Sequence, residues 1–308
     1  MKLKMKKLLG LALATAMIMS VTACSSVSVD GENNVSTETK EGNGSIGLSV
    51  STLNNPFFVT LSEGAKEKAK EEDVELIVVD AGDDAAKQAS DIEDLISKNI
   101  SVLIVNPVDS DAVAPAVEDA IAKGIKVIAV DRVVTGVDVD CEIASDNVAG
   151  AEMATEYLLS LVGEGATVAE LEGVPGASAT IDRGTGFHNI ADEKLNVVSS
   201  QTANFNRSEG MTVMENMLQA NPDIVGVFAH NDEMALGAVE AINGKDIMIV
   251  GFDATDDALA AVKEGKMAAT IAQQPDLMGA TAVEAAAKLI AGEIVEKEIP
   301  VDVTLVKE

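Results

Sequence analysis

Polar side chains that could bind a small hydroxylated ligand follow several short apolar runs of the sequence. They are Asn106 after VLIV, Asp131 and Arg132 after VIAV, Asn231 after VFAH, and Asp253 after IVGF. Ligands of open parallel sheets bind beyond the carboxyl ends of the strands, so strand-end residues are the first candidates for a site. An Asn or Asp at a strand end is also a common helix cap, and each residue taken alone keeps that alternative.

The aromatic residues are few, because the chain has no Trp, one Tyr and six Phe. Four phenylalanines fall at the ends of predicted elements, namely Phe57, Phe58, Phe205 and Phe252. A sugar ring offers apolar C–H faces that stack on such rings, and hydroxyls that need polar partners around its rim. Phe187 and Phe228 are predicted to be core residues instead.

Arginine is scarcer than lysine and occurs only as Arg132, Arg183 and Arg207. A planar guanidinium can donate to two adjacent hydroxyls in a way that lysine cannot. Arg132 and Arg183 are therefore candidate ligand contacts. Arg207 begins a predicted helix and is expected to make a surface ion pair.

Enzyme, metal and cofactor chemistry finds little support in the sequence. We find no G-x-S-x-G elbow, no G-x-x-x-x-G-K-[ST] phosphate loop and no H-E-x-x-H pair. His188 and His230 are isolated and are predicted to be surface or helix-start residues rather than metal ligands. Cys141 is predicted to be a buried, inert thiol. We therefore expect no enzyme activity, no metal and no cofactor.

The N-terminus is typical of a secretory signal, with four lysines before an apolar run and Val21-Thr22-Ala23 before Cys24. Residues 1–23 are expected to be a cleaved signal peptide, and the ending V-T-A-C favours lipidation of Cys24. The alternative is an ordinary cleavage site with an incidental cysteine. The polar residues that follow, to Gly44, are expected to form a flexible tether, so that 24–44 is the lipidated cysteine and its tether.

Cleavage at that point would leave 18 basic and 51 acidic residues, a formal charge of −33 against −29 for the full chain. Nucleic acid is excluded as a partner because phosphate binding needs a basic surface. A neutral or cationic ligand fits this negative field best. Contact with a membrane is expected through lipid only.

From Ile46 onward, short β-branched runs alternate with amphipathic segments up to KVIAVD, and the alternation restarts with a helix from Asn147 to Leu161. Such a pattern predicts parallel sheets covered by helices on both faces. The fold class is therefore α/β, with two doubly wound parallel-sheet lobes of about 130 residues each.

At these same residues the sequence resembles the bacterial ribose-binding proteins of the type 1 periplasmic-binding-protein superfamily. The similarity extends from about Ile46 to the C-terminus, through STLNNPFF, NPVDSDAV, ASDNVAGAE, NDEMALGA, GFDATDD and ATIAQQPD. His230, where glutamine is more usual, and the segment HNIADEKLN depart from the family pattern.

The resemblance implies twelve ligand contacts, none of them substituted in this chain. They are Asn55, Phe57, Phe58, Asn106, Asp131, Arg132, Arg183, Phe205, Asn231, Phe252, Asp253 and Gln273. It also implies a hinge with three crossings, near 144–146, 271–275 and 301–303. The implied N-terminal lobe is 45–145 plus 274–302, and the C-terminal lobe is 146–273 plus 303–308.

The function implied by this resemblance is that of an extracytoplasmic substrate-binding protein of a sugar ABC importer, which closes on D-ribose and docks on the permease and its ATPase. A monomer anchored by lipid to the outer face of the cell membrane is expected. The alternatives are another monosaccharide, such as allose, xylose or galactose, and a sugar-sensing lobe for a chemoreceptor or kinase. A LacI-like repressor shares the fold but would need a basic helix-turn-helix before Ile46, where this chain has the predicted signal and an acidic tether.

Overall fold

The structure, a computed structural model, describes residues 44–307. The predicted signal peptide, the lipidation site Cys24 and the tether up to residue 43 lie outside the described residues. No helix within the described part of the chain is both long and apolar enough to cross a membrane.

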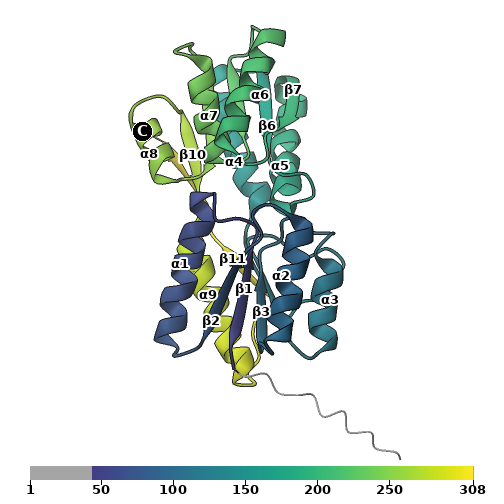
Figure 1. The fold of residues 1–308 in the computed structure, drawn as a ribbon. Helices are drawn as coiled ribbons and strands as arrows, with labels where there is room; N and C mark the ends of the chain where they lie inside the picture. The colour runs from purple at the N-terminus through teal and green to yellow at the C-terminus, as the bar shows by residue number, and fades with distance from the viewer. Residues whose placement is uncertain (1–43, 308) are drawn as a thin grey trace, which may run out of the picture. The chain divides into compact units, whose positions relative to one another are not determined.

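A six-stranded parallel sheet forms the first lobe, in the order β11-β5-β4-β3-β1-β2. Its strands are β1 Ile46–Val50, β2 Leu76–Asp80, β3 Val102–Val105, β4 Lys126–Val130, β5 Cys141–Ser145 and β11 Glu298–Val301. Its helices are α1 Pro56–Glu71, α2 Ala85–Ser97, α3 Ala114–Ala122 and α9 Pro275–Ile290. Helices α1 and α9 cover one face of the sheet, and α2 and α3 cover the other (Figure 1).

Strand β3 shows why the strands of this sheet are continuous apolar runs in the sequence. Val102 and Ile104 belong to the core under α1 and α9, whereas Leu103 and Val105 belong to the core under α2 and α3. Successive side chains of a strand point to opposite faces, so a strand covered on both faces must be apolar at every position.

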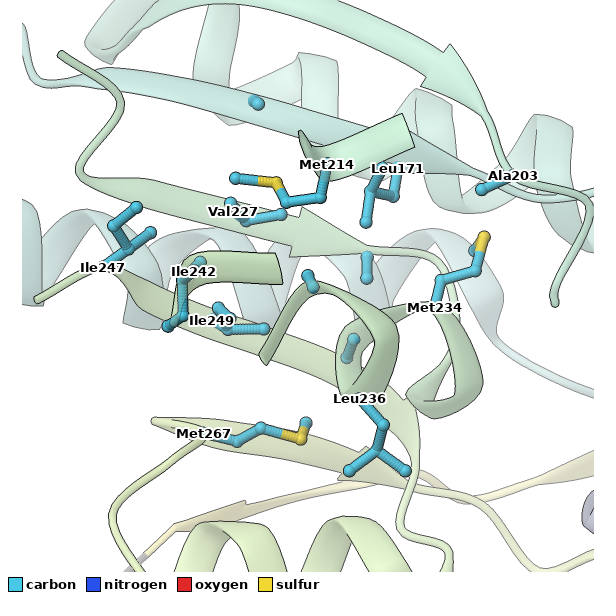
Figure 2. Close-up of a cluster of buried hydrophobic side chains, with 14 of the residues drawn as sticks. Leu171, Ala203, Met214, Val227, Met234, Leu236, Ile242, Ile247, Ile249 and Met267 are labelled. Atoms are coloured by element: carbon cyan, nitrogen blue, oxygen red, sulfur yellow. The ribbon is translucent and has the colours of Figure 1, made fainter. Parts of the chain in front are cut away.

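The second lobe is built on another six-stranded sheet, in the order β12-β10-β9-β8-β6-β7. Its strands are β6 Thr167–Glu172, β7 Asn196–Thr202, β8 Gly226–Ala229, β9 Met248–Asp253, β10 Ala269–Ala272 and β12 Thr304–Lys307. Its helices are α4 Asn147–Val162, α5 Ser178–Lys194, α6 Arg207–Ala220, α7 Asp232–Ile242 and α8 Asp256–Lys263. Figure 2 shows Met214, Val227 and Ile249 in the core on one face of this sheet. Phe187 and Phe228 are fully buried on the other face, as predicted.

Three connections carry the chain between the two sheets, from β5 to α4, from β10 to α9 and from β11 to β12. After the second connection, α9 returns to lie beside α1 (Figure 1). A β-carbon on Gly64 or Gly279 would lie 2.2 Å or 2.0 Å from a backbone oxygen of the facing helix, so these glycines permit the close packing.

Strand β12 is antiparallel to β10, unlike every other pair in either sheet. Only residues 302 and 303 separate it from β11. Since β11 ends at the carboxyl edge of the first sheet, β12 enters the second sheet from its carboxyl edge and must run against its neighbours. The α/β class with two doubly wound sheets is confirmed, with this one antiparallel edge strand.

Candidate functional site

A pocket lies where the carboxyl ends of the two sheets face each other. Ten of the twelve implied contact residues line it, together with Ala179. They are Asn55, Phe57, Phe58, Asp131, Arg132, Arg183, Phe205, Asn231, Asp253 and Gln273. The first five belong to the first lobe, and the next four belong to the second. A ligand here would touch both lobes at once.

In the first lobe, Asp131 and Arg132 follow β4 and form a buried charged pair. Arg132 Nε lies 3.6 Å from Asp131 Oδ2, and each side chain is only 4% exposed. Arg132 Nη1 donates to the Pro107 carbonyl oxygen at 2.7 Å, and Asn106 Nδ2 donates to Asp131 Oδ2 at 2.9 Å. Burial raises the pKa of Asp131 and lowers the pKa of Arg132, because both charged forms have lost solvent.

In the second lobe, Arg183 and Asp253 form the corresponding pair, with Arg183 Nη1 3.9 Å from Asp253 Oδ1. Arg183 Nε donates to Asn147 Oδ1 at 2.9 Å, and Gln273 Nε2 donates to Asp253 Oδ1 at 2.8 Å. Burial holds the pKa of Asp253 well above its usual range and lowers the pKa of Arg183. Each lobe thus presents one buried guanidinium and one buried carboxyl group to the pocket.

The phenylalanines divide into rings that line the pocket and one ring beneath it. Arg132 Cζ lies 5.1 Å from the Phe58 ring centroid and 5.3 Å from that of Phe205, so one guanidinium contacts an aromatic ring from each lobe. Phe252 is fully buried and does not line the pocket. Its ring centroid lies 3.9 Å from Arg183 Cζ, so Phe252 packs against the guanidinium that faces the ligand space.

Asn106 is the other implied contact that does not line the pocket. Its Oδ1 accepts from the Ser51 amide at 3.1 Å, and its Nδ2 donates to Asp131. Two lining residues are helix caps, Asn231, for which capping was the predicted alternative, and Asn55. Asn55 Oδ1 accepts from the Phe57 amide at 2.9 Å, and Asn231 Oδ1 accepts from the Met234 amide at 3.0 Å. Capping uses one oxygen of each and leaves amide hydrogens for other partners.

Two buried polar atoms of the pocket, Arg132 Nε and Gln273 Oε1, have no hydrogen-bond partner among residues 44–307. Buried polar atoms are almost always paired in folded proteins, because leaving one unpaired costs about 1–3 kcal/mol. One is a donor from the first lobe and the other is an acceptor near the second crossing. A ligand with several hydroxyls would satisfy both.

The backbone at the pocket is held in conformations that ordinary residues seldom adopt. Asp131, Phe205 and Asp253 have φ of 66°, 56° and 124°. Positive φ in a residue with a β-carbon stores strain, and such residues concentrate at ligand sites. All three residues line the pocket, where Asp131 follows β4, Phe205 lies between β7 and α6, and Asp253 ends β9.

Three hydrogen bonds join the lobes directly beside the pocket, and we call them the cleft contacts. The Ser110 amide donates to the Gly176 carbonyl oxygen at 3.0 Å, and the Ser178 amide donates to Ser110 Oγ at 3.2 Å. The Val133 amide donates to Ser178 Oγ at 3.1 Å. Ser110 and Val133 precede the first crossing and Gly176 and Ser178 follow it, so the structure is that of a closed cleft.

Several residues outside the pocket behave as the sequence predicts, and one does not. Arg207 pairs with Glu233 at 2.7 Å and with Asp257 at 2.8 Å on the surface. Cys141 is buried, and burial raises the pKa of its thiol to about 11. His230 stands directly before Asn231, the N-cap of α7, so the helix-start alternative holds, whereas a surface position is wrong because the side chain is fully buried against the equally buried Glu170. Within residues 44–307, no three His, Cys, Asp or Glu side chains are grouped as metal ligands.

Residues 46–294 match the family model described as periplasmic binding protein domain. The ribose import binding protein RbsB of Bacillus subtilis is 55% identical over 256 residues, covering 82% of this chain and 84% of that protein. Among solved structures, the Caulobacter myo-inositol binding protein bound to myo-inositol is 32% identical with a TM-score of 0.82, covering 86% of this chain and 93% of that chain.

A periplasmic solute binding protein of an ABC transporter from Actinobacillus succinogenes, with bound D-allose, is 33% identical with a TM-score of 0.79, covering 85% and 97% of the two chains. Fold, matched residues and sequence identity agree over most of the chain. This protein belongs to the periplasmic binding protein family.

Proposed function

We propose that this protein binds D-ribose in the pocket between its lobes and delivers it to the permease of an ABC importer. The observation that carries the proposal is that two buried atoms, Arg132 Nε and Gln273 Oε1, make no hydrogen bond within residues 44–307, in a pocket that both lobes line. The identity of 55% to a ribose import binding protein supports ribose as the sugar.

The side chains divide the work of binding by their chemistry. Phe57, Phe58 and Phe205 offer ring faces to the C–H faces of the sugar, and Asp131 and Asp253 accept from its hydroxyls. Arg132, Arg183, Asn55, Asn231 and Gln273 supply further donors and acceptors. Asn106 donates to Asp131, and the Phe252 ring packs against Arg183, so these two residues support the ligand contacts. A sugar of about ten heavy atoms reaches sub-micromolar affinity at about −0.8 to −0.9 kcal/mol per atom.

Binding is proposed to favour the closed state, because only there do both lobes contact the sugar. The bodies that move would be 45–145 plus 274–302 and 146–273 plus 303–308, turning about the three crossings. The ligand shifts this equilibrium only by its difference in affinity for the two states. The closed face is then the surface that docks on the permease, and a chemoreceptor or kinase would use the same face in a sensing role.

The place of action is proposed to be outside the cytoplasmic membrane, with a lipid on Cys24 as the anchor after removal of residues 1–23. The sequence before Cys24 supports this proposal, as does the membership of the family. Mass spectrometry of the membrane fraction tests it, since lipidation adds the mass of a diacylglycerol to a chain that begins at Cys24. A Cys24→Ala variant recovered in the same fraction would contradict it.

Isothermal titration of residues 25–308, refolded from denaturant to remove bound sugar, tests the choice of ligand. We expect one-to-one heat with D-ribose at micromolar affinity or tighter, and binding at least about a hundredfold weaker for allose, xylose, galactose, arabinose and myo-inositol, a gap of about 2.7 kcal/mol. Heat from another of these compounds with none from ribose would refute ribose as the ligand, and the proposal that the pocket binds a sugar would stand. Retention of a receptor ectodomain on the sugar-loaded protein would reveal the sensing role.

A further inference from the structure

A buried titratable pair lies directly behind the sugar pocket and does not line it. His230 Nε2 and Glu170 Oε1 are 2.9 Å apart, and both side chains are fully buried. His230 lies between the end of β8 and Asn231, which lines the pocket. The carbonyl oxygen of His230 accepts a hydrogen bond from Arg183 Nη1 at 2.6 Å. The position of His230 thus affects two residues that line the pocket, Asn231 and Arg183.

The hydrogen bonds of His230 identify its neutral form. The Gly173 amide donates to His230 Nδ1 at 3.4 Å, and an amide N–H can only donate, so Nδ1 carries no proton. Nε2 therefore carries the proton and donates it to the carboxylate of Glu170. A second proton on His230 would go to Nδ1, and the Nδ1–H and the Gly173 amide N–H would then be two donors that face each other.

Gly173 in turn supports the ring of Phe205. A β-carbon on Gly173 would lie 2.0 Å from Phe205 Cζ, so the ring packs directly on this backbone. The carbonyl oxygen of Gly173 also accepts from Thr202 Oγ1 at 2.7 Å. A shift of Gly173 away from a protonated His230 would therefore move Phe205, whose ring lines the pocket.

We propose that His230 is a positioning residue of the sugar site, and that protonation of its Nδ1 weakens sugar binding. This inference rests on the proposed function, since it needs a sugar in the pocket. The neutral ring holds Asn231, Arg183 and Gly173 in the arrangement described above. The proton from solvent breaks the bond to Gly173 and places a second positive charge next to Arg183.

The charged groups around His230 lie on β6 and α5. Glu170 and Glu172 of β6 favour its protonated form, and Arg183 of α5 disfavours it. Burial is the largest influence and holds the pKa of His230 below its usual value. His230 is thus protonated in the acidic range, and protonation removes the neutral form of the ring that the arrangement of the pocket requires.

A second histidine on α5 provides a matched control. His188 Nε2 lies 3.2 Å from Glu170 Oε2, and His188 Nδ1 lies 2.7 Å from Asp192 Oδ1. Burial opposes its charging, but the hydrogen bond to Asp192 and the charge of Glu170 outweigh this and raise the pKa of His188. His188 therefore takes up a proton before His230 does, touches the same carboxylate, and is not one of the residues that line the pocket.

The test compares the D-ribose affinity of the wild type, His230→Gln and His188→Gln between pH 8 and pH 5. A glutamine amide can donate to Glu170 and accept from Gly173 without titrating. We expect the wild type and His188→Gln to lose about fivefold or more in affinity toward pH 5 relative to His230→Gln, within the usual range of coupling between sites. Parallel profiles for the wild type and His230→Gln would overturn the inference.

A second readout does not depend on the His230 variant folding. The chain has two histidines, so His188→Gln leaves one imidazole signal for NMR. Because coupling is reciprocal, a fivefold loss of affinity on protonation requires ribose to lower the pKa of His230 by about 0.7 pH unit. A signal that titrates identically with and without ribose, or does not titrate in either state, would overturn the inference. Absence of ribose binding at every pH would instead refute the proposed function.

Discussion

The substitution Gly173→Ala adds one methyl group behind the pocket and should weaken sugar binding through Phe205. The new β-carbon would lie 2.0, 2.3 and 2.5 Å from three atoms of the Phe205 ring. Ordinary carbon contacts need about 3.5–4.0 Å, so the ring must move by about 1.5 Å or more. The backbone of Phe205 has φ of 56°, which leaves it little freedom to absorb the movement.

The expected loss follows from the contacts that the ring makes. Displacing Phe205 weakens its stacking on the sugar, worth about 0.5–1.5 kcal/mol, and its contact with Arg132, worth about 0.5–1 kcal/mol or more. Together these give about 2 kcal/mol, or roughly thirtyfold in the dissociation constant. Overpacking should also lower the free energy of unfolding by about 1–3 kcal/mol.

Titration calorimetry with D-ribose measures the first effect, and urea unfolding without sugar measures the second. Gly184→Ala is the comparison variant, because a β-carbon there meets His230 Cε1 at 3.6 Å and Glu170 Oε1 at 3.8 Å, which are ordinary contacts that require no movement of that pair. Gly184 lies inside α5, so alanine should raise stability slightly and leave affinity within about twofold. Wild-type ribose affinity in a folded Gly173→Ala protein would refute the placement of Phe205 against the sugar.

Three further perturbations follow from the same geometry. Asp131→Ala leaves the buried Arg132 without its carboxylate and should weaken ribose binding by about 2–5 kcal/mol, measured by calorimetry, so an unchanged affinity would contradict the pairing. Gly176→Ala would place a β-carbon 2.2 Å from Asp109 Oδ2 at a residue with φ of 86°, and small-angle scattering should show less compaction with ribose than in the wild type, whereas equal compaction would rule out a role in closure. Burial raises the pKa of Asp232 to about 7, above its unfolded value of 3.8. The contribution of its protonated carboxyl group to the free energy of unfolding is therefore complete below pH 3.8 and is lost as the pH rises through 7. The free energy of unfolding of Asp232→Asn relative to wild type should therefore rise across this range, and a constant difference in urea unfolding would show that the carboxyl does not titrate there.

The strand pattern was sufficient to predict part of the residues that gather at the pocket, because parallel strands share a carboxyl edge, whereas Asn55 and Gln273 were implied only by the family resemblance. Asp131, Arg132 and Asp253 follow apolar runs, and the structure brings all three to that edge. Phe252 was predicted as a ring facing the sugar, and in the structure its ring packs against Arg183 and does not line the pocket. Its side chain is fully buried against Arg183, since a strand-end residue can point toward the core as readily as toward the ligand space.

Other features depend on pairs of residues far apart in the chain, which no local pattern reports. His230 is buried because Glu170, sixty residues earlier, supplies a buried carboxylate. The cleft contacts between Ser110 and Ser178 depend on how the two lobes meet, and periodicity within either lobe carries no information about that. Ala179 lines the pocket without any chemical signal in its side chain.

A crystal structure of the refolded protein with D-ribose is the most direct test of the account. The account predicts one pentose between the lobes, with Arg132 Nε and Gln273 Oε1, which make no hydrogen bond within residues 44–307, each within hydrogen-bond distance of a sugar hydroxyl. A sugar bound elsewhere, or one that leaves both atoms without a partner, would contradict it.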